Sequence, residues 1–105
     1  MTIYTPDVWE MIEFYSPNHG TAEKILGGWY GGWGGSDSWQ LNSGITKYEI
    51  VGDWIEFTGY SGSVYRCHKS HRKLSGYTSS IFNSFVDQFS NVPGCYVKIS
   101  EKEFI

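Results

Sequence analysis

Cys67, His68 and His71 are the side chains whose types and close spacing could support catalysis or metal binding. A cysteine beside a histidine base would act as a nucleophile, and Cys67 with His71 and Cys95 would begin a zinc site. Neighbouring residues on a strand point to opposite faces, which separates Cys67 from His68. The second ligand pair of a zinc finger is absent. We therefore expect no cofactor and interpret Cys67 and Cys95 as reduced, small buried residues on strands.

Three further patterns come close to catalytic motifs without completing one. Gly59-Tyr-Ser-Gly-Ser63 has the letters of a nucleophile elbow, but its serine and following glycine are displaced by one position. Glu49 and Glu56 could pair for acid–base chemistry, but their strand positions predict an outer sheet face. The glycine run 27–35 lacks the Gly-Lys-Ser/Thr ending of a phosphate-binding loop. The sequence therefore favours a protein without enzymatic activity.

Aromatic and small polar side chains gather in two segments, 27–39 (GGWYGGWGGSDSW) and 59–66 (GYSGSVYR). Dense glycine costs backbone entropy, and burial of aromatic rings is the expected compensation. Asp37 and the serines beside it can fix a turn by accepting from nearby backbone N–H groups. Exposed tryptophan and tyrosine form contact surface for a protein partner or a nucleobase. The predicted binding surface consists of Trp29, Tyr30, Trp33, Ser36, Asp37, Trp39, Tyr60, Ser61, Ser63, Tyr65 and Arg66.

Burial in the core is the alternative role for the tryptophans. Aromatic side chains supply most of the burial in a small domain, so some of the five tryptophans must lie inside. We expect Trp9 in the core. For Trp29 and Trp33 a core position and an exposed position are equal alternatives.

Charge is distributed unevenly along the chain. Residues 1–65 hold eight acidic and two basic side chains, whereas 66–73 (RCHKSHRK) hold four basic side chains and two histidines. Such a stripe could contact phosphates, with stacking from Tyr65 and Tyr77. The net charge of −3 opposes the approach of a polyanion. We therefore favour a solvated connector and keep nucleic-acid binding as an alternative.

Strands and one helix must position these segments. Apolar alternation on both faces of 8–15 predicts a strand that is flanked on both sides or that lies near the middle of a curled sheet. Apolar residues at helical spacing predict an amphipathic helix over 77–89, capped by Ser75 or Thr78. Segment 41–43 is ambiguous, and the remaining predicted strands are 21–30, 46–51, 54–60, 64–68 and 95–100. A helix is the alternative for 21–30, although Gly27-Gly28 argues against its continuation.

A two-residue turn at Gly52-Asp53 sets the register of one predicted hairpin. Ile50 then lies opposite Ile55 on an apolar face. The same register sets Glu49 opposite Glu56, which requires either a neighbouring cation or a bulge that shifts the pairing.

The predicted fold class is α+β. We expect a curled, mainly antiparallel sheet of five to six strands, forming a partial barrel, with one amphipathic helix near the C-terminus. A chain of 105 residues fits a single domain, 1–105. We see no apolar run long enough to span a bilayer and no secretory leader.

Three segments together resemble small proteins encoded by tailed phages and prophages: 24–33 (KILGGWYGGW), 35–45 (GSDSWQLNSGI) and 59–69 (GYSGSVYRCHK). The resemblance covers residues 8–80 and supplies no catalytic residues, because that family has no settled activity. It implies a phage accessory protein in the cytoplasm of a bacterial host. Such proteins commonly bind and inhibit host factors, including defence systems, or sequester small signalling nucleotides.

Three functional hypotheses follow. The leading one is a non-enzymatic phage accessory protein, monomeric or homodimeric, that binds and inhibits a host protein through 27–39 and 59–66. The second is a binder of a small nucleotide-like ligand, with Arg66, His68 or Lys69 meeting its phosphate. The third is a nucleic-acid-binding module using 66–73. None of them involves a membrane.

Overall fold

The computed structural model of the protein describes residues 1–31 and 34–104. Its strands form two four-stranded sheets. Sheet A has the order β1-β7-β6-β5, and sheet B has the order β4-β3-β2-β8. The elements are β1 (Ile3–Tyr4), β2 (Val8–Ser16), β3 (Gly20–Trp29), β4 (Ser38–Leu41), β5 (Ile45–Val51), β6 (Trp54–Gly59), β7 (Val64–His68), the short 3₁₀ helix η1 (Lys69–His71), α1 (Gly76–Ser90) and β8 (Tyr96–Ile99).

The α+β class is confirmed, but the single curled sheet is wrong in detail, because the described strands form two sheets and no closed barrel. The division falls at 42–44, between β4 and β5. Gly44 has a φ of 125°, which turns the chain away from β3, so β5 begins the second sheet. Alternation along a strand shows which faces are apolar, but it does not show which strand will be the neighbour.

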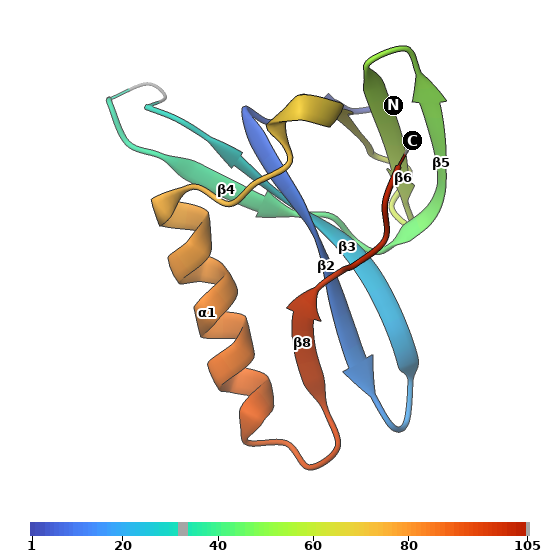
Figure 1. Ribbon diagram of the computed structural model, residues 1–105, viewed down its shortest axis with the longest axis vertical. Coiled ribbons are helices and arrows are strands. Elements are labelled where there is room, and N and C mark those ends of the chain that lie inside the picture. Colours follow the sequence, from blue (N-terminus) through green and yellow to red (C-terminus); the bar gives the residue numbers. More distant parts are fainter. Residues whose placement is uncertain (32–33, 105) are drawn as a thin grey trace.

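β2 and β3 form the long hairpin at the centre of the molecule (Figure 1). Residues 8–12 of β2 are buried on both faces, as predicted for part of the segment 8–15. On one face Trp9, Met11 and Ile25 pack against sheet A. On the other face Ile12 and Leu26 pack under α1. Trp9 is 1% exposed, so its predicted place in the core is confirmed.

The core between the sheets combines side chains from strands far apart in the sequence. Sheet A contributes Ile55 and Phe57 from β6 and Tyr65 and Cys67 from β7, all of them buried. Phe104, near the end of the chain, packs on Phe57 with ring centroids 5.2 Å apart. The inner faces of sheet A and of the β2–β3 hairpin therefore form one apolar layer.

Helix α1 begins at a capping box. The Ser75 hydroxyl accepts from the Thr78 N–H at 3.0 Å, and the Ser75 N–H donates to the Thr78 hydroxyl at 2.7 Å. The helix start lies so close to β3 that a Cβ on Gly28 would come within 2.7 Å of the Thr78 methyl carbon. Glycine at this position of β3 therefore lets the helix approach. The apolar side chains that α1 places on sheet B are Ile81, Phe82, Phe85, Val86 and Phe89.

The register of the β5–β6 hairpin is as predicted, with Ile50 opposite Ile55 and Glu49 opposite Glu56. The cation that the two glutamates require is Arg66 on β7, whose Nε lies 3.7 Å from a Glu56 carboxylate oxygen. The register shift in this hairpin lies further along, between Ile45 and Lys47. On β8, the outer strand of sheet B, Val97 is buried whereas Ile99 is 39% exposed.

One arginine holds the C-terminal segment in place. Arg72 donates to a Glu10 carboxylate oxygen at 2.6 Å and to the carbonyl oxygens of Lys102 and Ser100 at 2.6 and 3.0 Å. Its guanidinium also lies over the rings of Trp9 and Phe104. Arg72 therefore ties the segment after β8 to the middle of the fold.

Within 1–31 and 34–104, no helix combines the length and hydropathy needed to cross a bilayer.

Candidate functional site

Two adjoining hollows lie between an outer strand of sheet A and an outer strand of sheet B. One has a volume of about 390 Å³ and the other about 260 Å³. Tyr4 and Gln40 line both, so the hollows are adjacent, and we name the pair of hollows the β1–β4 groove. The first hollow is completed by Ile3, Thr5, Trp29, Ser38 and Trp39, and the second by Leu41, Asn42, Ser43, Ser61, Ser63 and Tyr65.

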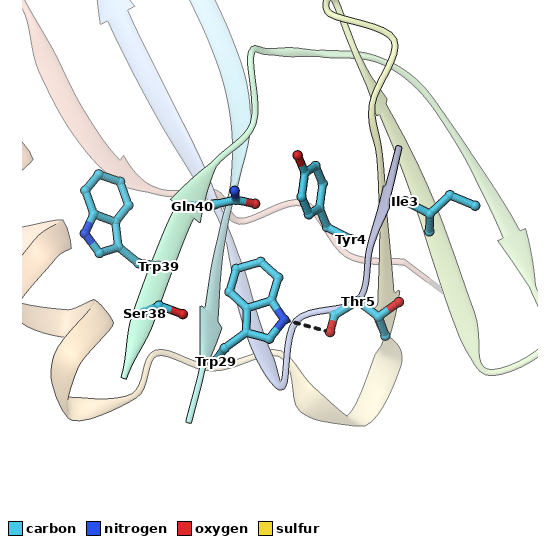
Figure 2. A pocket seen from close by; sticks show the side chains of 7 residues that line it. All are labelled: Ile3, Tyr4, Thr5, Trp29, Ser38, Trp39 and Gln40. Carbon is cyan, nitrogen blue, oxygen red and sulfur yellow. Dashed lines mark hydrogen bonds between the residues drawn. The ribbon is translucent and has the colours of Figure 1, made fainter. Parts of the chain in front are cut away.

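Aromatic rings form a wall along one side of this groove. Trp29 meets Tyr4 edge to face at a centroid distance of 6.5 Å, and Tyr4 meets Tyr65 at 5.2 Å. Figure 2 shows the Trp29 indole between β3 and Tyr4, where its Nε1 donates to the Thr5 carbonyl oxygen at 3.1 Å. This hydrogen bond fixes the ring while leaving part of it open to the groove. The Trp29 side chain is partly buried, so its exposure lies between the predicted core position and the predicted exposed position.

Hydroxyl and amide groups line the other end of the groove. The Ser43 hydroxyl accepts from the Ser61 N–H at 3.0 Å, which joins the β4–β5 connection to the turn after β6. The Asn42 side-chain oxygen accepts from the Ile25 N–H at 2.8 Å. Its amide nitrogen is buried and has no hydrogen-bond partner among the described residues. This end therefore contains a polar donor that the described fold does not use.

The groove is electrically neutral. Among the described residues that line it, none is an Asp, Glu, Lys, Arg or His. Burial, with smaller contributions from Tyr4 and Cys67, raises the pKa of Tyr65 to about 12. The phenol therefore stays protonated at neutral pH and donates to the Gln40 side-chain oxygen at 3.5 Å. A phosphate or other ion would find no opposite charge here.

Carboxylates hold the described part of the loop between β3 and β4. The Asp37 carboxylate accepts from the Gly31 N–H at 2.8 Å, which confirms the predicted turn. Tyr30 is half exposed, and its N–H donates to the Asp7 carboxylate at 2.8 Å. Ser36 is exposed beside them, and Trp33 lies outside the described residues. This loop thus closes the end of the β3–β4 pair.

Three predicted site residues point elsewhere. The Trp39 ring packs edge to face on Phe85 of α1 at 5.8 Å, and Figure 2 shows it directed away from Tyr4 and Trp29. Tyr60 is 78% exposed and borders a different hollow. Arg66 lies on the outer face of sheet A, where its guanidinium carbon is 3.9 Å from the Trp54 ring centre. The groove therefore joins only part of the predicted surface.

The candidate ligands Cys67, His71 and Cys95 do not form a metal site in the described part of the chain. No cluster of three His, Cys, Asp or Glu side chains within 1–31 and 34–104 could hold a metal ion. Cys67 is buried in the core, and burial raises the pKa of its thiol far above the ordinary value. A protonated, inaccessible thiol is a poor nucleophile and a poor metal ligand.

The predicted binding surface lacks eight residues that line the groove, among them Tyr4, Gln40, Asn42 and Ser43. Tyr4 belongs to a strand of only two residues, which is too short to show alternation. Gln40, Asn42 and Ser43 lie in or next to the segment 41–43 that the pattern left ambiguous. A usable signal was present in Asn42-Ser43-Gly44, because such residues mark a change of chain direction.

Comparison of the chain with protein family models, curated proteins and solved structures finds no match.

Proposed function

We propose that the protein is a non-catalytic binding protein whose β1–β4 groove holds a segment of another protein. The observation that carries this proposal is the neutral groove with an aromatic wall at one end and amide and hydroxyl groups at the other. Large rigid rings supply contact area at low entropic cost, and uncharged polar groups satisfy the backbone of a bound chain.

The kind of partner is suggested by the sequence. Segments 24–33, 35–45 and 59–69 resemble small proteins of tailed phages. We therefore propose that the partner is a protein of the bacterial host and that its inhibition is the biological role. A phosphorylated ligand fits the groove less well, because Arg66 is paired with Glu56 on the outer face of sheet A.

Capture from a bacterial lysate, followed by reconstitution with the purified partner, tests the proposal. The informative variant is Gln40→Arg, which places a charge at the point shared by both hollows. The matched control is Gln88→Arg, the same substitution at an exposed position on α1. We expect Gln40→Arg to weaken the complex at least tenfold and Gln88→Arg to leave it unchanged.

Two results would overturn the proposal. If the wild-type chain retains no protein even after chemical crosslinking, binding of a host protein is wrong. If the partner binds the Gln40→Arg variant as tightly as wild type, the contact surface lies elsewhere on the molecule.

A further inference from the structure

The four outer strands of the two sheets differ in how well they are protected against pairing with another chain. β5 carries Lys47 and Glu49 and contains the register shift, and β8 carries Lys98 and lies beside α1. Charges, bulges and covering helices are the usual devices that prevent an outer strand from pairing. β1 (Ile-Tyr) and β4 (Ser-Trp-Gln-Leu) have neither a charge nor a register shift.

β4 is the outer strand of sheet B, and at alternate residues its backbone N–H and C=O groups point away from β3. The Asn42 N–H donates to the Ile25 carbonyl oxygen at 3.0 Å, so this pair belongs to the hydrogen-bonded set of the β3–β4 ladder. Hydrogen-bonded and non-hydrogen-bonded pairs alternate in an antiparallel ladder. Gln40 therefore bonds to β3, and the N–H and C=O groups of Trp39 and Leu41 point outward.

The same argument applies to β1. Val64 donates its N–H to the Thr2 carbonyl oxygen at 2.9 Å, and Ile3 lies opposite Val64 in a parallel register. In a parallel pair the residues on either side of Ile3 make the bonds to β7, so the Ile3 backbone groups point away from sheet A. Figure 2 shows β1 and β4 on the two sides of the groove. Two short outer strands that lack charges and register shifts thus border one neutral, aromatic groove.

We infer that the groove binds its partner by strand addition: an extended, uncharged segment of the partner protein pairs with β4 through the backbone groups of Trp39 and Leu41. This inference rests on the proposed function and specifies its binding mode. Main-chain hydrogen bonds supply the affinity, and alternate side chains of the segment face the Trp29–Tyr4 wall. The uncharged lining selects against acidic and basic side chains at the buried positions.

An N-methyl scan of a bound peptide tests the backbone pairing. The probe is the tightest seven-residue peptide without charged residues selected from a random displayed library on the wild-type chain. Each backbone N–H of the synthetic peptide is replaced in turn by N–CH₃. We expect at least a tenfold loss of affinity at alternate positions and less than a threefold loss at the positions between them.

Proline substitutions test the pairing from the side of this chain. Trp39→Pro removes the outward N–H and the ring, whereas Trp39→Ala removes only the ring. We expect the proline variant to bind the peptide at least tenfold more weakly than the alanine variant, with similar melting temperatures. Ile50→Pro against Ile50→Ala is the matched control on β5, because the two-residue turn directs the Ile50 N–H outward. That pair is expected to bind the peptide equally.

Each contrary result has a distinct meaning. Strand addition is overturned by uniform N-methyl effects or by equal binding of the peptide to Trp39→Pro and Trp39→Ala. In that case the proposed function still stands if the Gln40→Arg variant loses the captured partner. Failure of the library to yield any groove-binding peptide also overturns strand addition. A chain that dimerises in solution and is made monomeric by Trp39→Pro would show that the occupant is a second copy, which overturns the partner segment.

Discussion

The β1–β4 groove and the outer face of sheet A are built from similar residue types but differ in how many of their groups are already paired. On the outer face Arg66 lies over Trp54 and beside Glu56, and the His68 and His71 rings stack with centroids 4.6 Å apart. In the groove, the outward backbone groups of two outer strands pair with no other strand of the described sheets. Residue type alone therefore does not identify a binding surface, because cross-strand partners decide which groups are free.

The basic segment 66–73 teaches the same lesson. It was an alternative nucleic-acid site in the sequence, but two of its four basic side chains are committed to the fold. Arg66 neutralises Glu56, and Arg72 binds Glu10 and two carbonyl oxygens. A phosphate would have to compete with these contacts.

Replacing Arg72 should have the largest effect on stability. If the variant is as stable as wild type, the basic segment is not paired with the fold, and its contrast with the groove fails. Arg72→Met leaves the buried Glu10 carboxylate without its partner, so we expect a loss of about 3–5 kcal/mol in the free energy of unfolding. Urea denaturation measures it. The double variant Glu10→Gln with Arg72→Met should recover part of the loss. An unchanged denaturation midpoint in Arg72→Met would contradict the structural role.

Alkaline pH should give the second largest effect. The fold raises the pKa of Tyr65 from 10 to about 12, so its stabilisation is complete below pH 10 and is lost as the pH rises through about 12. The difference corresponds to about 2–3 kcal/mol. Burial also raises the pKa of Cys67, which adds to the loss above pH 9.

Two tyrosine variants test the contribution of Tyr65 to this pH dependence. Tyr65→Phe should flatten the stability profile between pH 10 and 12 in denaturation experiments. Tyr96→Phe serves as the control, because the Tyr96 pKa is raised mainly by its hydrogen bond to Glu13 at an exposed position. Equal profiles for both variants would show that Tyr65 is not buried in the groove wall.

Loss of the α1 capping box should have a smaller effect. Ser75→Ala removes the acceptor for the Thr78 N–H and should cost about 1 kcal/mol. Ser80→Ala is the control, because the Ser80 hydroxyl bonds only to the Tyr77 carbonyl oxygen at an exposed helix position. Thermal unfolding followed by circular dichroism measures both, and equal melting temperatures would exclude a role of the cap in stability.

Arg66→Ala should have the smallest effect and sharpens the contrast between the two regions. The pair with Glu56 is more than a third exposed, so we expect a loss below about 1 kcal/mol. The affinity for the captured partner should change less than twofold. A tenfold loss of affinity would move the binding surface from the groove to the outer face of sheet A.

Local features of this fold were predictable, and distant pairings were not. The Gly52-Asp53 turn and its flanking alternation predicted the β5–β6 register, because a two-residue turn leaves one pairing. Ser75 and Thr78 were likewise the two candidate helix caps in the sequence, and the structure joins both in one capping box. The pairing of β1 with β7 joins segments about sixty residues apart, and no periodicity in either segment encodes it.

The candidate site shows the same division. Trp29, Ser61, Ser63 and Tyr65 were predicted from two segments, but only β1 and Asn42–Gly44 bring the segments together. The Trp39 ring was expected at the binding surface. It packs on Phe85 because Trp39 and Leu41 share the face of β4 that α1 covers.

The position of β8 and the Arg72 contacts have a consequence for biosynthesis. β2 emerges from the ribosome early, but its partner β8 and the carbonyl oxygens of Ser100 and Lys102 are made only after the rest of both sheets. At a synthesis rate of roughly 5–20 residues per second, the nascent β2–β3 hairpin exposes apolar surface for several seconds before the rest of the chain can cover it. The exposed hairpin is thus the part of the nascent chain that is open to aggregation until β8 has been made.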